Sequence, residues 1–200
     1  PTLVAGSTWP GDENALIAAF AAILTERPDA RLIVVPHEPT PGHLARLEAL
    51  AAHAGLPRPV RLSEATGPVP LLAVDRVGVL AALYGAGSMA YVGGGFGRAG
   101  LHSVLEPAAW GLPVVFGPRW QESRDAALLR EAGAAVFVNG ADGMRTVWEK
   151  WLQDAAGCAA MGRRAREVVE SGLGAARRSA EMLDQLISSR PPRMSPSGGR

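Results

Sequence analysis

Residues 91–107 read YVGGGFGRAGLHSVLEP, an apolar run that leads through a glycine-rich segment into a helical pattern. Glycine lets a backbone approach a ligand closely and adopt dihedral angles that other residues avoid. A helix that opens directly after such a loop presents free N–H groups and the positive end of its dipole, which suits a phosphate. The stretch predicts a strand, a glycine loop and a helix that carries His102 and Glu106, the local structure of a nucleotide site.

Short apolar runs alternate with helical patterns on both sides of this stretch. Strands are predicted at 3–5, 32–35, 60–62, 71–74, 89–92, 114–116 and 135–138. Helices are predicted between them at 13–25, 43–54, 79–84, 104–110 and 121–131. Asp12 is the expected N-cap of the first helix, and Gly55 is expected to end the second. This alternation indicates an α/β fold, a doubly wound parallel sheet covered on both faces.

The last third of the chain is predicted to be helical only. Helices are expected at 144–152, 155–171 and 175–187, and the tail 188–200, rich in Pro, Ser, Gly and Arg, is expected to be disordered. We therefore predict one Rossmann-like domain over 1–187, with a helical extension from about residue 140. Pro1 is followed almost at once by a strand, with no initiator Met and no signal peptide, so we expect a piece of a longer protein.

Composition narrows the function classes. The 200 residues are 48% hydrophobic and carry a net charge of +1, which favours a packed globule and argues against a nucleic-acid surface. The lone Cys158 excludes an internal disulfide and is expected to be a buried small residue. The four histidines lack metal-ligand spacing, so neither a metal nor another cofactor is predicted; His43 and His53 are expected at the surface.

Ligands of open parallel sheets bind outside the carboxyl ends of the strands. Polar or glycine-rich segments follow the predicted strands at 6–9, 36–39, 75–78 and in the glycine loop. Their candidate ligand-binding residues are Ser7, His37, Glu38, Asp75, Gly93, Gly94, Gly95, Arg98, His102 and Glu106. Arg98 and Arg119 are the cations best placed for an anionic ligand.

Each candidate also has an ordinary structural interpretation. The glycine run can be a phosphate cradle or a tight strand-to-helix turn. Glu106 can hold a ribose diol or stand exposed at a helix start, where the dipole favours it. His102 can donate to a phosphate or a sugar carboxylate, or be a structural histidine. Asp75 can contact a ligand or cap the helix that follows it.

Taken together, these segments resemble one known family. The matching segments are 5–8, 36–38, 63–64, 75–80 with 83–84, 93–106 and 113–118. In order and spacing they resemble the C-terminal half of the bacterial Kdo transferases, which add 3-deoxy-D-manno-octulosonic acid (Kdo) to a lipid A precursor with CMP-Kdo as donor. Two positions depart from the family pattern: Pro36 precedes His37 where many members have arginine, and Ser103 stands where many have asparagine.

The resemblance implies a GT-B architecture, two Rossmann-like halves facing a cleft, with the C-terminal half holding the nucleotide sugar. It places His37, the run 93–95, His102, Ser103 and Glu106 around CMP. The general base of the family is a glutamate of the N-terminal half, so no catalytic residue is expected in this chain.

The function we expect is that of the donor-binding domain of a metal-independent, inverting glycosyltransferase of lipopolysaccharide biosynthesis. Its partners would be CMP-Kdo and, through the other half, the lipid A precursor. It would act at the cytoplasmic face of the bacterial inner membrane, with membrane contact only through that other half. Two alternatives remain: a GT-B enzyme that uses a UDP-sugar, and a non-catalytic nucleotide-binding module.

Overall fold

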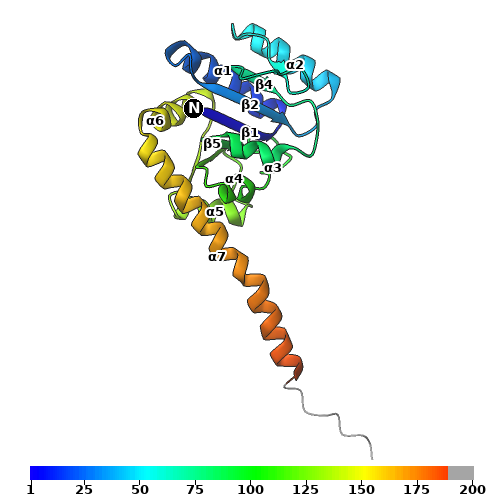
Figure 1. Cartoon of the computed structure of the whole chain (residues 1–200), viewed down its shortest axis with the longest axis vertical. Helices are drawn as coiled ribbons and strands as arrows, with labels where there is room; N and C mark the ends of the chain where they lie inside the picture. Colours follow the sequence, from blue (N-terminus) through cyan, green and yellow to red (C-terminus); the bar gives the residue numbers. More distant parts are fainter. Residues whose placement is uncertain (189–200) are drawn as a thin grey trace, which may run out of the picture. The chain divides into compact units, whose positions relative to one another are not determined.

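The computed structural model describes residues 1–188, so the predicted disordered tail lies outside the described residues except for Ser188, which ends a helix. Seven strands form one sheet in the order β3-β4-β2-β1-β5-β6-β7, and every neighbouring pair is parallel. The strands are β1 Thr2–Thr8, β2 Arg31–Pro36, β3 Val60–Arg61, β4 Leu71–Ala73, β5 Met89–Val92, β6 Val114–Phe116 and β7 Ala135–Phe137 (Figure 1). The predicted doubly wound parallel sheet is confirmed.

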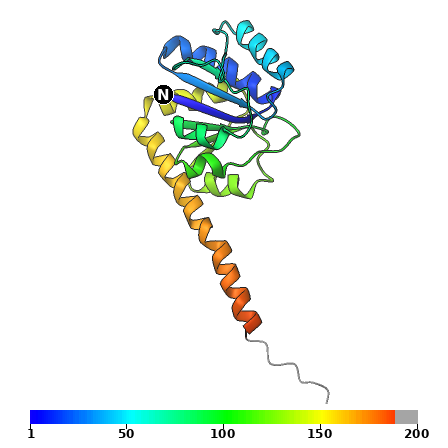
Figure 2. The ribbon, with the colours of Figure 1, turned by 45° about the vertical axis from the view of Figure 1, so that its right-hand side comes forward.

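Helices connect successive strands, except that β3 and β4 are joined by the helix-free segment 62–70, and further helices follow the last strand. They are α1 Pro10–Glu26, α2 Pro41–His53, α3 Leu80–Leu83 with the 3-10 turn η1 Tyr84–Ala86, α4 Leu105–Ala109, α5 Arg124–Glu131, α6 Ala141–Gln153 and α7 Ala155–Ser188 (Figure 2). The two helices predicted at 155–171 and 175–187 are a single helix, because the glycines between them weaken a helix without breaking it. The chain divides into two compact units, Pro1–Val169 and Glu170–Arg200.

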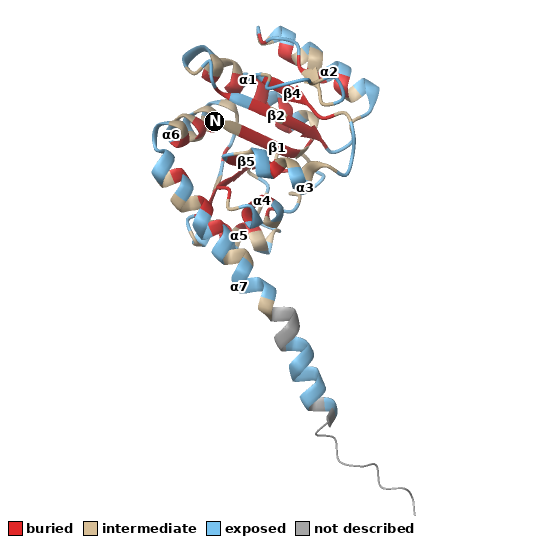
Figure 3. Cartoon of the chain, viewed as in Figure 1, coloured by how far each residue is buried: buried red, intermediate tan, exposed pale blue. Residues whose placement is uncertain are grey.

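Alternate residues of the central strand pack on opposite faces of the sheet. Leu3 and Ala5 belong to a buried cluster that includes side chains of α1, α2 and α6. Val4, between them, packs instead with Tyr84 of η1. Because the inner strands are covered on both faces, β1, β2, β4 and β5 appear mostly buried in Figure 3. This explains why the sequence shows continuous apolar runs rather than alternation.

Helix boundaries differ from the prediction at two places next to the site. The N-cap of α1 is Trp9, not Asp12, because Pro10 takes the first helical position, where its missing N–H costs nothing. Helix α4 begins only at Leu105, so His102 lies in the preceding loop and shares no helix face with Glu106. The end of α2 is as predicted: Gly55 follows the helix with φ of +71°.

The lone cysteine is buried, as expected, and the helices can be checked for a membrane span. Cys158 is buried, and burial raises its pKa to about 11, so the side chain is a thiol at neutral pH. Within residues 1–188, none of the helices combines the length and apolar content that a membrane span requires.

Candidate functional site

Three aromatic rings from three different loops stack at the carboxyl edge of the sheet. The ring centroids of Trp9 and His37 are 4.8 Å apart, and those of His37 and His102 are 4.5 Å apart. Trp9 follows β1, His37 follows β2, and His102 lies in the loop after β5. The structure thus brings together the two predicted histidines and adds Trp9, which the sequence marked only as part of the segment 6–9. We call Trp9, His37 and His102 the aromatic stack.

The stack fixes which nitrogen of His102 carries a proton. The indole Nε1 of Trp9 donates to Nε2 of His102 at 3.0 Å, so Nε2 is the unprotonated nitrogen. Burial lowers the pKa of His102, the neighbouring His37 lowers it further, and the Asp12 carboxylate opposes both. A neutral His102 therefore carries its proton on Nδ1, and this N–H is the donor it can offer to a ligand.

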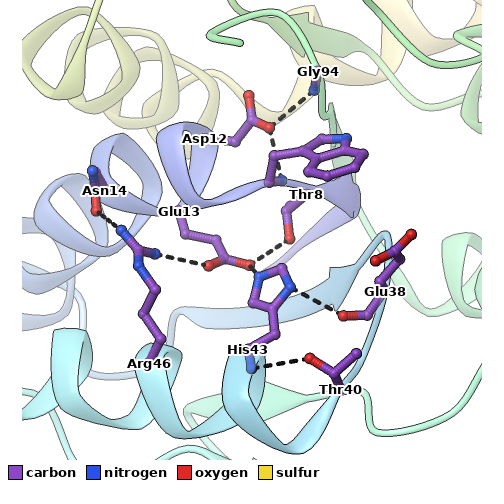
Figure 4. A network of polar contacts seen from close by, with 10 residues as sticks. Thr8, Asp12, Glu13, Asn14, Glu38, Thr40, His43, Arg46 and Gly94 are labelled. Carbon is purple, nitrogen blue, oxygen red and sulfur yellow. Dashed lines mark hydrogen bonds and ion pairs between the residues drawn. The ribbon is translucent and has the colours of Figure 1, made fainter. Parts of the chain in front are cut away.

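The Asp12 carboxylate, fully buried in the first turn of α1, organises the glycine loop. It accepts hydrogen bonds from the backbone N–H of Trp9 at 2.9 Å, of Gly94 at 2.9 Å and of Phe96 at 3.4 Å. The Tyr91 hydroxyl donates to it at 2.5 Å. Burial raises the pKa of Tyr91 well above its ordinary value and Asp12 raises it further, so the hydroxyl keeps its proton. Two N–H groups of the predicted phosphate cradle thus point at Asp12 (Figure 4 shows the Gly94 contact).

The glycines themselves are required by close backbone packing. A Cβ on Gly93 would lie 2.1 Å from the Ser7 carbonyl oxygen, and one on Gly95 would lie 2.7 Å from the Gly117 nitrogen. Gly94 has φ of +94°, and a Cβ there would lie 1.9 Å from the carbonyl oxygen of Gly100. The loop is therefore wedged between the ends of β1 and β6, which favours the tight-turn interpretation of the glycine run.

Glu13, next to Asp12 and also fully buried, organises the loop after β2. Its Oε1 accepts from the Thr8 hydroxyl at 2.9 Å and faces Nε2 of His43 at 2.8 Å, while Arg46 lies 3.5 Å from Oε2 (Figure 4). The other ring nitrogen of His43 faces the Glu38 carbonyl oxygen at 3.0 Å. His43 was expected at the surface and instead bridges α1 to the loop that carries His37.

The remaining candidates occupy separate positions along the same edge. Asp75 is not a helix cap, since Val79 caps α3; it accepts from the backbone N–H of Ser63 at 3.3 Å and from the Ser63 hydroxyl. This hydroxyl lowers the pKa of Asp75. The Glu38 side chain is exposed, while its carbonyl oxygen accepts from the backbone N–H of Thr40 at 2.8 Å and faces Nδ1 of His43 at 3.0 Å.

Ser7, Ser103 and Glu106 are the candidates that remain near the glycine loop. Ser7 has φ of +52°, the sole left-handed residue other than glycine within residues 1–188. Ser103 and Glu106 are exposed. Glu106 is close enough to the buried Tyr84 to add to the rise in that hydroxyl's pKa, which burial dominates.

Arg98 and Arg119, the two cations considered for an anionic ligand, lie near each other in the structure. Both line a pocket of about 620 Å³ between the tip of the glycine loop and the loop after β6. The pocket is lined by Gly97, Arg98, Gly100, Leu101, Arg119, Trp120, Gln121, Glu122 and Ser123. Among the described residues, no group of His, Cys, Asp and Glu side chains is arranged to hold a metal ion.

Comparison with known proteins identifies relatives of this chain. It is 34% identical over 135 residues to the 3-deoxy-D-manno-octulosonic acid transferase of Aquifex aeolicus, covering 68% of this chain and 37% of that protein. It is 31% identical over 194 residues to the transferase of the same name from Bordetella pertussis, covering 94% of this chain and 45% of that protein. The chain thus spans less than half the length of these curated relatives. No family model matches it.

Solved structures share the fold. The C-terminal CMP-Kdo binding domain of WaaA from Acinetobacter baumannii superposes with a TM-score of 0.75 at 21% identity, covering 84% of this chain and 88% of that one. Anabaena HepE in complex with UDP superposes with a TM-score of 0.65 at 15% identity, covering 92% of this chain and 48% of that one. Because the sequence identities are low, these matches support the Rossmann-like half of a GT-B fold rather than a particular ligand.

Proposed function

We propose that this chain, a homologue of the C-terminal part of the 3-deoxy-D-manno-octulosonic acid transferases, is the donor-binding domain of a Kdo transferase. It would bind CMP-Kdo and serve the inverting transfer of Kdo to a lipid A precursor in lipopolysaccharide biosynthesis. The observation that carries the proposal is the 31% identity to such a transferase over 94% of the chain, in a fold whose carboxyl edge gathers the aromatic stack beside the glycine loop.

The site residues would hold the nucleotide with a small number of donors and acceptors. The Nδ1–H of His102 suits a phosphate oxygen, and the exposed carboxylate of Glu106 suits the two hydroxyls of a ribose. A hydrogen-bond donor held in place at the phosphate would also stabilise the negative charge that develops on CMP as it leaves. Asp12 and Glu13 would not contact the nucleotide themselves. They would position the two loops that carry His102 and His37.

The rest of the reaction would belong to the part of the protein outside this chain. The general base and the acceptor surface would come from an N-terminal half, and so would contact with the cytoplasmic face of the inner membrane. The 200-residue chain should therefore bind the nucleotide without transferring sugar.

Calorimetric titration of the chain with CMP, UDP and NAD tests this function. CMP should bind more tightly than UDP and NAD. Preferential binding of UDP would favour the UDP-sugar alternative, and preferential binding of NAD would favour a dinucleotide-binding module. Kdo transfer by the purified chain would contradict the assignment of the base to the other half.

A further inference from the structure

The pocket that contains Arg98 and Arg119 has no role in the nucleotide contacts described so far. We propose that it is a subsite for the carboxylate of the donor sugar, which makes the site selective for a sugar acid over a neutral sugar. This inference rests on the proposed function, since it concerns the sugar that the bound CMP carries.

The position of the pocket fits the sugar of a nucleotide held at the aromatic stack. Gly100 and Leu101 line the pocket, and His102 follows them directly in the chain. The loop folds tightly on itself here: a Cβ added to Gly94 would lie 1.9 Å from the Gly100 oxygen and 3.3 Å from the His102 ring. Because the lining residues Gly100 and Leu101 adjoin His102, we expect the sugar attached to a phosphate at the Nδ1–H of His102 to lie beside the pocket.

The guanidinium of Arg119 is partly fixed across the pocket. Its Nη1 donates to the carbonyl oxygen of Gly97 at 3.3 Å, which links the loop after β6 to the tip of the glycine loop. A guanidinium has five N–H donors, so the remaining four can serve a ligand. Arg98, one residue beyond Gly97, lines the same pocket.

The charges of the pocket favour an anion. Among the described residues, neither Arg98 nor Arg119 forms an ion pair, whereas Arg27 and Arg145 contact carboxylates at 3.0 and 2.8 Å. Glu122 is the one acidic residue of the lining, so two cations face one anion. A planar guanidinium matches a carboxylate through two parallel hydrogen bonds, and the donor sugar is by name an acid.

Calorimetry with CMP and CMP-Kdo on the 200-residue chain separates the sugar contribution from the nucleotide contribution. The unmodified chain should bind CMP-Kdo about tenfold more tightly than CMP, as expected for charge-assisted hydrogen bonds. The double variant Arg98→Gln/Arg119→Gln should lose this difference and keep its affinity for CMP. Arg119→Lys, which keeps the charge without the fork, should lose part of the difference.

Arg124→Gln is the matched control, because Arg124 is exposed at the start of α5 and does not line the pocket. It should leave both affinities unchanged. An undiminished CMP-Kdo advantage in the double variant would reject the subsite and leave the proposed function standing. An equal loss for CMP and CMP-Kdo would assign the arginines to the phosphate instead. If the unmodified chain bound no CMP, the proposed function would fail and the subsite with it.

Discussion

The glycine loop and the loop after β2 reach the same edge of the sheet but are held there by different chemistry. Asp12 holds the glycine loop through backbone N–H groups and the Tyr91 hydroxyl. Glu13 contacts the ring of His43, whose other nitrogen faces the Glu38 carbonyl oxygen, and lies 3.5 Å from Arg46, which is 41% exposed. The two ring nitrogens of His43 face the Glu38 carbonyl oxygen at 3.0 Å and the Glu13 carboxylate at 2.8 Å.

This difference means that adjacent carboxylates of one helix turn should respond differently to perturbation. The Asp12 contacts use backbone N–H groups and a buried hydroxyl, so the glycine loop should be the rigid side of the site. The Glu13 contacts use long side chains of α2, one of them exposed, so the loop that carries His37 should be the adaptable side of the site.

The largest loss of stability is expected from Gly94→Val, which adds a branched side chain to the glycine loop that Asp12 holds. The new Cβ would lie 1.9 Å from the Gly100 oxygen, at a φ of +94° that branched residues avoid. We expect a loss of roughly 3 kcal/mol or more in the free energy of unfolding, measured by urea denaturation. Gly97→Ala is the matched control, since a Cβ there meets nothing closer than 3.9 Å. Equal stability of the two variants would show that the loop is not wedged as described.

The next effect compares the two carboxylates directly. Asp12→Asn places an amide group against fixed N–H donors and should cost about 3 kcal/mol of unfolding free energy. Glu13→Gln keeps an acceptor that the Thr8 hydroxyl can use and should cost about 1 kcal/mol. Asp29→Asn, at an exposed ion pair with Arg27, is the control and should change little. A larger loss for Glu13→Gln than for Asp12→Asn would invert the comparison.

Much of the fold was predictable because both faces of the sheet are buried. Strands β5 and β6 coincide with the predicted runs 89–92 and 114–116, since continuous burial leaves continuous apolar sequence. The site was predicted less completely. The carboxyl-edge rule brought His37 and His102 together, but the role of Asp12 depends on partners 79 to 84 residues away in the chain.

The glycine loop shows why local patterns were insufficient there. A glycine that admits a phosphate and one that admits another backbone segment look the same in a sequence. Here the backbone at the ends of β1 and β6 packs against the loop, so the glycines admit another backbone segment. Only the tertiary fold shows this contact. The same packing keeps His102 outside α4, which begins only at Leu105. The backbone N–H of His102 donates to the Gly93 carbonyl oxygen at 3.1 Å.

A binding effect without a stability effect is expected at Glu106. The side chain is exposed, so Glu106→Gln should leave the unfolding free energy unchanged while CMP binding weakens about tenfold through loss of a charged acceptor. Calorimetry with CMP measures the change, and Glu122→Gln, in the neighbouring pocket, is the control with intact CMP affinity. Unchanged affinity in Glu106→Gln would remove the ribose role.

The smallest effect is expected from deletion of residues 172–200. Both loops belong to the compact unit Pro1–Val169, and the described part of α7 beyond it exposes Leu173, Met182, Leu183 and Ile187. The truncated chain should retain its melting temperature and its CMP affinity. Ala165→Asp, at a buried position of the same helix, should lower the melting temperature clearly. A large drop on truncation would show that the helix end stabilises the sheet domain.

The Trp9 indole resonance reports on the site before any nucleotide is added. Because the pKa of His102 is lowered, the Trp9–His102 hydrogen bond contributes stability above the ordinary histidine pKa of about 6.5. That contribution disappears as the pH falls through the lowered value and Nε2 gains a proton. The indole N–H resonance of Trp9 should therefore shift with a midpoint below about 6.5.

The most direct measurement follows the Trp9 indole N–H resonance while CMP is added at neutral pH. The variant Trp9→Phe identifies this resonance, because it lacks the signal. We predict that the Trp9 indole N–H shifts with the same dissociation constant that calorimetry gives, while the indole of the buried Trp148 does not move. CMP binding that leaves the Trp9 and His102 resonances unchanged would place the nucleotide elsewhere and contradict a donor site at the aromatic stack.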